Sequence, residues 1–370
     1  MELLNFIWTN GASFVFILTV IVFAHELGHY LVARRNGVRV EVFSIGFGPE
    51  IFGRTDRLGT RWKISLVPLG GYVKMFGESA FSGAKDDTAQ ATTAEERKAS
   101  FHTKRLSQRA AIVAAGPLAN FVLATIILAL LFATAGQPFT PPNIGAVQPG
   151  SAADEAGFQP GDVILNIGAT RIERFEQVQR IVRMNPNVPL RITVKREGRE
   201  LVLTATPKLS VLTDRFGGRY EVGLLGVSRK GIAYVRHGPV TAVLRAAEET
   251  YRVSVLTLQA VGQIIAGTRS SEELGGPIRI AQMSGQVAEG GLTSIFWFMA
   301  VLSINLGLVN LFPIPMLDGG HLLFYAVEAV RGKPLSEKLM EYGFRIGLGL
   351  VLTLLVFVTY QDLKRLLWFL

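Results

Sequence analysis

The residue types best suited to chemistry stand together near the N-terminus, in the pentad His25-Glu26-Leu27-Gly28-His29. Residues four apart lie on one face of a helix, so both imidazoles can bind the same zinc ion. Glu26 then lies beside the metal and can take a proton from a water that the metal acidifies. The pentad therefore predicts a Zn²⁺ site at His25 and His29, with Glu26 as the base of a hydrolytic reaction.

Two imidazoles need a third protein ligand if one coordination position is to stay open for water. The candidates, Asp318 and His321, follow Asn310 in the stretch NLFPIPMLDGGH. Two glycines after Asp318 free the backbone to aim a carboxylate, which favours Asp318, but spacing alone leaves His321 as the alternative.

The composition and the clustering of apolar residues indicate a membrane protein. Hydrophobic residues make up 49% of the 370 and charged residues only 18%, against about 25% charged in a typical soluble domain. Apolar runs near the length needed to cross a bilayer occur at about 11–32, 110–135, 292–309 and 343–358. We therefore expect an α-helical multi-spanning membrane protein with about four transmembrane helices. The pentad falls inside the first run, where ionisable groups persist only if paired, metal-bound or hydrated.

The distribution of basic residues predicts the orientation. Lys and Arg gather in residues 33–109, between the first two runs, and residues 1–10 contain neither. By the positive-inside rule, the N-terminus lies outside and the active site lies toward the cytoplasm. The net charge of +9 then reflects topology and contact with the anionic lipid bilayer, and no nucleic-acid partner is expected. With no cysteine in the chain, disulfides and thiolate chemistry are excluded.

The segment after the second run reads as a small domain outside the membrane. NIGAVQPGSAADEAGFQPGDVILNIGATRI supplies short strands, a Pro-Gly turn and a small helix, and RFEQVQRIVRM reads as an amphipathic helix. The pattern resembles a circularly permuted bacterial PDZ domain, which implies peptide binding by strand addition, with a peptide C-terminus as a candidate ligand. Ile144-Gly145-Ala146 resembles its carboxylate-binding loop; an ordinary turn is the other interpretation.

The whole chain then divides into segments of different character. They are a first transmembrane helix with the pentad (1–36), a membrane-associated β-hairpin region (37–78), a cytoplasmic loop (79–108), a second transmembrane helix (109–136), an extracytoplasmic PDZ-like α+β domain (137–230), an amphipathic or interfacial helical region (231–290), and third and fourth transmembrane helices with the NxxPxPxLDG motif (291–370).

These motifs together resemble the site-2 protease family of intramembrane zinc metalloproteases. The resemblance rests on H-E-x-x-H in the first span, the PDZ-like domain and N-x-x-P-x-P-x-L-D-G late in the chain, with GPLANF at 116–121 and LGGPI at 274–278 as further motifs. Within the family the chain resembles the bacterial RseP-type proteases, here with a single PDZ domain. This implies a multi-pass protein of the bacterial inner membrane.

The resemblance also implies roles for particular residues. Zinc ligands would be His25, His29 and Asp318, Glu26 would act as catalytic base and acid, and Asn310 would help to hold the substrate backbone. The hairpin at Gly70-Gly71-Tyr72-Val73-Lys74 would pair with an extended substrate.

The hypothesis is an intramembrane zinc metalloprotease that cleaves transmembrane segments of single-span membrane proteins, as in anti-sigma factor processing. Signal-peptide remnants are alternative substrates of the same chemistry. Two hypotheses from other classes are a zinc transporter and a non-catalytic PDZ scaffold. A transporter needs polar groups along several spans, whereas the ionisable groups here collect at one depth, and a scaffold has no use for an intact H-E-x-x-H.

Overall fold

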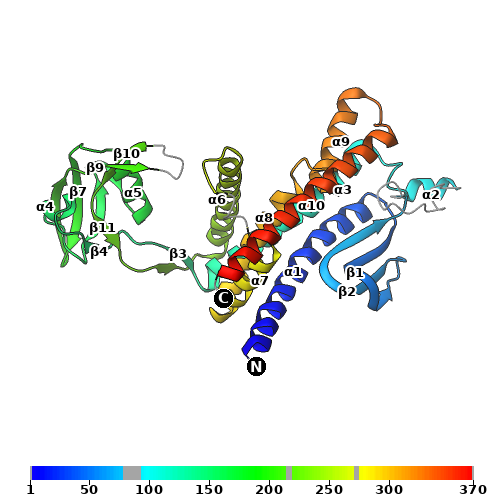
Figure 1. Cartoon of the computed structure of the whole chain (residues 1–370), viewed down its shortest axis with the longest axis horizontal. Coiled ribbons are helices and arrows are strands. Elements are labelled where there is room, and N and C mark those ends of the chain that lie inside the picture. The colour runs from blue at the N-terminus through cyan, green and yellow to red at the C-terminus, as the bar shows by residue number, and fades with distance from the viewer. Residues whose placement is uncertain (1, 78–92, 214–218, 271–274, 369–370) are drawn as a thin grey trace. The chain divides into compact units, whose positions relative to one another are not determined.

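The structure is a computed structural model that describes residues 2–77, 93–213, 219–270 and 275–368. It divides into two compact units. The first comprises Met1–Leu131, Thr241–Gln259 and Ser271–Leu370, and the second comprises Phe132–Val240 and Ala260–Ser270. The first unit holds the long apolar helices, and the second is rich in strands (Figure 1).

Four helices of the described residues are long and apolar enough to cross a membrane. They are α1 (Glu2–Arg35), α3 (Leu106–Thr134), α8 (Leu292–Asn310) and α10 (Glu337–Trp368). The candidate spans within α1, α3 and α10 are Gly11–Arg35, Leu106–Thr134 and Lys338–Arg365, and that in α8 is the whole helix. The four predicted apolar helices are thus confirmed, and the last is considerably longer than the predicted 343–358.

Small residues bring α1 and α3 into close contact. A methyl group on Gly28 of α1 would collide with the carbonyl oxygen of Ala115 and with the side chain of Ala119 on α3. Inside lipid there is no hydrophobic driving force between helices, so the van der Waals packing that such close approach allows stabilises their association. The pentad in α1 is therefore held directly against α3.

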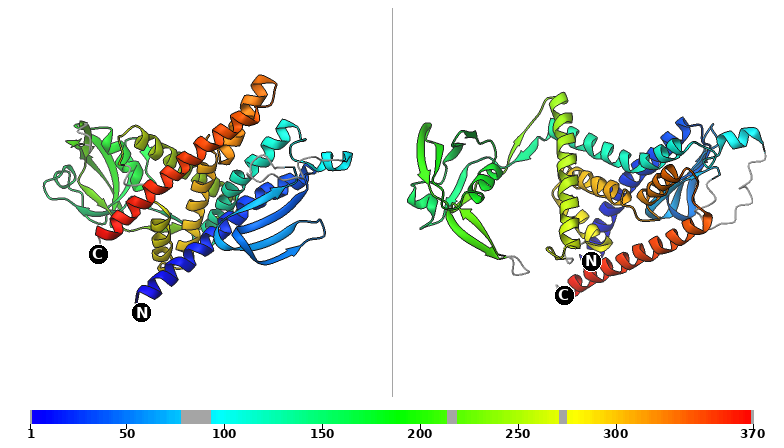
Figure 2. Two further views of the ribbon diagram at one scale, coloured as in Figure 1. Left: turned by 45° about the vertical axis from the view of Figure 1, so that its right-hand side comes forward. Right: turned by 90° about the horizontal axis from the view of Figure 1, so that it is seen from above.

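The predicted β-hairpin is present as β1 (Val40–Thr55) and β2 (Arg61–Met75), a bent antiparallel ribbon beside α1 (Figures 1 and 2). The ribbon folds back on itself, because residues 42–45 of β1 pair both with residues 61–64 and with residues 71–74 of β2. Residues 71–74 consequently form an edge of this small sheet. Phe43 stacks on Trp62 and meets Tyr30 of α1 edge-on, which fixes the ribbon to the helix.

The segment predicted as a cytoplasmic loop at 79–108 contains a short helix. Residues 78–92 lie outside the described residues, but Ala94–Ala99 form the helix α2. Thr93 and Glu96 make a reciprocal capping box at its start, which satisfies two backbone N–H groups that a short helix otherwise leaves unpaired.

The second unit is built around a four-stranded antiparallel sheet in the order β6-β5-β7-β8. Its elements are β3 (Gln137–Phe139), β4 (Ile144–Val147), α4 (Ala152–Glu155), β5 (Val163–Ile167), β6 (Thr170–Arg171), α5 (Phe175–Arg183), β7 (Leu190–Arg196), β8 (Arg199–Ala205), β9 (Lys208–Thr213), β10 (Arg219–Leu224), β11 (Val227–Arg229) and β12 (Ala233–Val235). Ile144, Ile164 and Ile192 are fully buried in its core, against the α5 residues Val178 and Val182.

Three further helices complete the chain. They are α6 (Pro239–Ile265), α7 (Pro277–Glu289) and α9 (Asp318–Arg331). The sequence predicts α6 as an interfacial helix, and it is not among the helices apolar enough to cross a membrane. Asp362 of α10 accepts hydrogen bonds from the backbone N–H groups of Gly276 and Arg279 at the start of α7, which ties these two helices together.

Candidate active site

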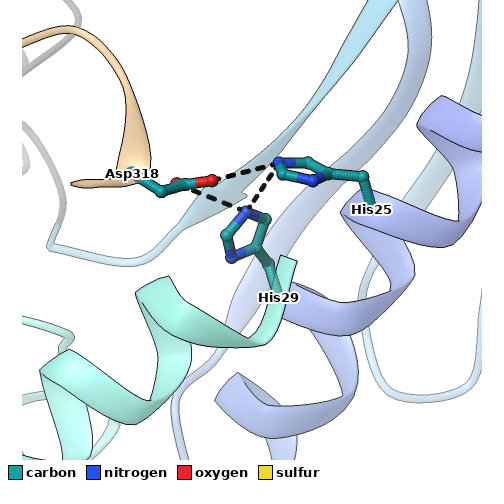
Figure 3. Close-up of side chains that lie close together, drawn as sticks. All are labelled: His25, His29 and Asp318. Atoms are coloured by element: carbon teal, nitrogen blue, oxygen red, sulfur yellow. Dashed lines mark hydrogen bonds and ion pairs between the residues drawn. The ribbon is translucent and has the colours of Figure 1, made fainter. Parts of the chain in front are cut away.

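His25 and His29 project from one face of α1 toward the first residue of α9, Asp318 (Figure 3). The Nε2 atoms of the two histidines lie 3.2 Å apart. Asp318 places Oδ2 3.2 Å from Nε2 of His25 and Oδ1 3.6 Å from Nε2 of His29. The three side chains from distant parts of the sequence thus form one cluster of nitrogen and oxygen donors, buried or nearly so.

This donor set fits a zinc ion. Zinc takes imidazole nitrogen and carboxylate oxygen at about 2.0–2.1 Å, and ligands at the corners of such a tetrahedron lie about 3.3–3.4 Å apart. The observed separations of 3.2 to 3.6 Å match these edges. Three protein ligands leave a fourth position for water or substrate, which is the pattern of catalytic rather than structural zinc sites.

Helix α3 supports the imidazole of His29. Nδ1 of His29 lies 2.9 Å from the carbonyl oxygen of Ile112 and donates to it, which leaves Nε2 free for a metal. Gly116, one turn further along α3, lies against the same ring, where a methyl group would overlap Nε2. Pro117 lacks an N–H group and so interrupts the helical hydrogen bonds in this turn.

Glu26 faces a cavity of about 380 Å³ that also contains the donor cluster. The side chain of Glu26 is only 8% exposed and packs against Gly71 of β2. The cavity is lined by all three candidate ligands and by residues of β2, α8, α9 and the segment before α9, among them Tyr72, Val73, Leu306, Asn310, Met316, Leu317, His321 and Tyr325. A carboxylate and a donor cluster that line the same cavity can carry out metal-assisted hydrolysis.

Asn310 and His321 both reach the cavity but differ from the ligand candidates. Asn310 is the last residue of α8 and lines the cavity wall. His321 lines the cavity as well, and its ring packs against Phe344 at a centroid distance of 5.4 Å. Among the described residues the metal-binding cluster contains Asp318 and not His321, which favours the carboxylate where spacing leaves both open.

The two glycines after Asp318 act by close packing rather than by freeing the backbone. Both lie inside α9 with ordinary helical geometry. A methyl group on Gly319 would collide with the carbonyl oxygens of Leu311 and Phe312, and one on Gly320 with that of Ile314. The start of α9 is therefore pressed against the chain that leaves α8, and this contact fixes the position of Asp318.

Sequence reasoning gave no role to two residues near the site. Gly116 and Asn120 belong to the GPLANF motif, whose resemblance to a family motif assigns neither residue a role. Gly116 makes room for His29, and the buried amide of Asn120 lies 3.2 Å from Nδ1 of His25. The Gly-Pro pair in the middle of an apolar run is the feature of the sequence that could have indicated this contact. Both residues destabilise the interior of a helix, so their presence there points to a structural role.

Comparison with known proteins agrees with this site. The model of the protein family described as "Peptidase family M50" matches residues 13–354 of this chain. A protein of Agrobacterium fabrum named as a zinc metalloprotease is 43% identical over 359 residues, covering 96% of this chain and 95% of that protein. Metalloprotease MmpA of Caulobacter vibrioides is 38% identical over 377 aligned positions, covering 95% of each chain. Protease RseP of Yersinia pestis is 34% identical over 466 positions, covering 98% of this chain and all of that protein. The chain is thus a zinc-dependent protease and belongs to peptidase family M50, the site-2 protease family.

Proposed function

We propose that this protein cleaves peptide bonds within the membrane, with His25, His29 and Asp318 as the zinc ligands and Glu26 as the catalytic base and acid. The proposal rests above all on the donor cluster, whose separations match a tetrahedral zinc site and whose two histidines lie inside the candidate span Gly11–Arg35. Ionisable groups at such depth are retained only when they are paired, metal-bound or hydrated.

The residues of the chain then have distinct tasks. When bound, zinc acidifies a water and polarises the scissile carbonyl group. Glu26 takes the proton from the attacking water as the new C–O bond forms, and then passes it to the departing amine as the peptide C–N bond breaks. Val22, Gly71 and the other walls of the cavity limit access of bulk water to this carboxylate.

We propose that the edge of the β-ribbon binds the substrate backbone. Among the residues that the structure describes, 71–74 pair with β1 on one side only, and Gly70, Gly71, Tyr72 and Val73 line the cavity. A helical peptide bond is shielded, so a transmembrane substrate must unwind before it is cut. Addition of the unwound segment as a strand replaces the backbone hydrogen bonds that it loses. Asn310, which also lines the cavity, would hold the substrate backbone through its side-chain amide.

We infer that the substrates are transmembrane segments of single-span membrane proteins, with remnants of signal peptides as the alternative. The orientation inferred from the basic residues places the site toward the cytoplasmic side of a bacterial inner membrane. Comparison of membrane peptides that accumulate in cells carrying Glu26→Gln, against cells carrying the unchanged protein, separates the two substrate classes.

Replacing Glu26 by Gln tests the catalytic proposal. The purified variant should keep one zinc per chain, because Glu26 is not among the three ligand donors, and should lose about 10²–10⁴-fold in cleavage rate. Zinc is measured by elemental analysis and cleavage with a single-span substrate in detergent. Full activity in Glu26→Gln would remove Glu26 from the mechanism, and loss of zinc would make it a ligand instead.

We also propose that the second unit is a single PDZ domain whose ligand groove lies between α5 and residues 223–227. A cavity of about 110 Å³ is lined there by Val178 and Val182 of α5 and by Leu225 and Val227. The N–H groups of Leu225 and Gly226 have no acceptor among the described residues, and a peptide carboxylate would supply one.

The predicted carboxylate-binding loop at Ile144-Gly145-Ala146 is wrong. These residues belong to β4, which pairs with β11 on one side, and the N–H group of Ile144 donates to the carbonyl oxygen of Asp162 on the other. A backbone occupied in this way has no N–H group to offer at Ile144.

A pair of peptides tests the groove. A short fluorescent peptide ending in Leu should bind the full-length protein more tightly with a free C-terminal carboxylate than with an amidated C-terminus. Equal binding of the two peptides, or binding of neither, would favour a role of this unit as a size filter rather than a peptide receptor.

A further inference from the structure

The amide of Asn120 is buried beside His25 in an arrangement that leaves one of its atoms without a partner. Asn120 lies on α3 and is 0% exposed. Its Nδ2 atom is 3.2 Å from Nδ1 of His25, while its Oδ1 atom is buried and has no hydrogen-bond partner in the described part of the chain. Buried amide oxygens in folded proteins nearly always accept a hydrogen bond, so the orphaned oxygen calls for an explanation.

The protonation of His25 supplies that explanation. Nε2 of His25 faces Asp318 and His29, and a neutral imidazole that binds a metal through Nε2 carries its proton on Nδ1. Nδ1–H is then a donor and needs an acceptor. While Nδ2 of Asn120 lies beside His25, its NH₂ group would face that N–H group, and two donors would meet.

Rotation of the amide by half a turn removes the conflict. The oxygen and nitrogen of an Asn side chain are nearly equal in size, and their assignment follows from the hydrogen-bond network. After rotation, Oδ1 lies beside Nδ1 of His25 and accepts its proton. The same change gives the orphaned oxygen a donor and moves the NH₂ group into the buried place that the oxygen occupied.

The geometry points to Asn120 as a positioning residue: the carbonyl of its amide accepts the Nδ1–H of His25 and fixes this ring for zinc through Nε2. This inference rests on the proposed ligand set. It makes α3 the common support of both histidines, since Ile112 of the same helix accepts from Nδ1 of His29. The buried hydroxyl of Ser303 on α8 donates to the backbone oxygen of Asn120 at 2.8 Å and anchors α3 at this level.

Two substitutions separate hydrogen bonding from packing. Asn120→Leu keeps the approximate shape and removes the acceptor, and loss of such a partner typically lowers metal affinity about 10–100-fold. Asn120→Asp offers only acceptor oxygens toward His25, so it should bind zinc at least as tightly as the unchanged protein. Zinc affinity is measured on the full-length protein in detergent by competition with a chelator. If Asn120→Asp loses zinc as Asn120→Leu does, the amide acts through its NH₂ group or through packing, and the inference is overturned.

A matched control is available at Asn305 of α8. Its side-chain oxygen accepts from Thr257 of α6 and from neither histidine. Asn305→Leu makes the same chemical change and should leave zinc affinity within about two-fold. An equal loss in Asn305→Leu would attribute the effect to disturbed helix packing and would refute the assignment of Asn120.

His25→Ala distinguishes this inference from the ligand set on which it rests. If His25→Ala loses zinc while Asn120→Leu retains full affinity, the ligand stands and the role of Asn120 fails. If His25→Ala binds zinc like the unchanged protein, the proposed ligand set itself is wrong. Should Asn120→Leu elute as misfolded protein in size-exclusion chromatography, the affinity of Asn120→Asp relative to the unchanged protein decides the question.

Discussion

Gly116 of α3 lies directly against the imidazole of His29, at the ring nitrogen that faces Asp318. A side chain of any size at this position would occupy the space of the ligand itself. The proposed metal site is therefore shaped by a residue that carries no functional group.

Gly116→Ala should weaken zinc binding by at least about 10-fold, as expected when the support of a metal ligand is disturbed. The added methyl group overlaps Nε2 of His29, so the ring must turn away from the cluster. Gly262→Ala in α6 is the matched control, because a methyl group there meets nothing within 4 Å. The control should keep full zinc affinity and gain up to about 1 kcal/mol of helix stability. Equal zinc affinity in the two variants would contradict the steric argument.

Gly71→Ala should impair the reaction and spare the metal. A methyl group at Gly71 would lie 2.7 Å from the carbonyl oxygen of Ser44, 2.9 Å from Cγ1 of Val22 and 3.1 Å from Cγ of Glu26. Displacing a catalytic group by about 1 Å can cost about 10²-fold in rate. Zinc content and cleavage rate are measured on the same preparation, and a loss of zinc equal to that in Gly116→Ala would place the damage at the ligands instead of Glu26.

Asp318→Ala and His321→Ala together decide the third ligand. Removal of the Asp318 carboxylate should abolish stoichiometric zinc binding, because it contacts both histidines. His321 packs against Phe344 and lies outside the donor cluster, so His321→Ala should still hold one zinc per chain. Elemental analysis after gel filtration gives the answer, and the reverse pattern would make His321 the ligand.

Acid should destabilise the second unit through Asp162. Burial opposes the charge of this carboxylate and by itself would raise its pKa. Arg196 donates to it from Nε at 2.7 Å and from Nη2 at 2.8 Å, and the backbone N–H group of Gln159 donates a further hydrogen bond. Because these donors outweigh the effect of burial, the pKa of Asp162 lies below its ordinary value. A carboxyl group with a lowered pKa in the folded state stabilises the fold at pH values above the unfolded pKa of about 3.9. That contribution is lost as the pH falls below this value toward the folded pKa.

Hydrogen exchange of the full-length protein measures this effect locally. Protection of β5 and β7 should fall on acidification from pH 5 to pH 3, after correction for the intrinsic exchange rate. Asp162→Asn should be less protected already at pH 5 and should respond less to acid. An unchanged acid response in this variant would assign the effect to other carboxylates.

The amino-acid sequence by itself determined the local elements and the chemical class. Residues at four-residue spacing on a helix must share a face, so the pentad was sufficient to predict His25 and His29 as a pair with Glu26 beside them. Whether a segment forms a helix or a strand depends largely on residues that are close together in the sequence. Long apolar runs and alternating segments were therefore sufficient to predict the four apolar helices and the β-ribbon correctly.

Only the tertiary structure decided which distant groups meet. Asp318 reaches the histidines, and His321 does not join them, because Gly319 and Gly320 let α9 pack against the carbonyl oxygens that follow α8. The occupied backbone of Ile144 and the acceptors that α3 offers to the two imidazoles are further examples. Such contacts depend on how helices and strands approach one another, and the pattern of neighbouring residues does not encode that approach.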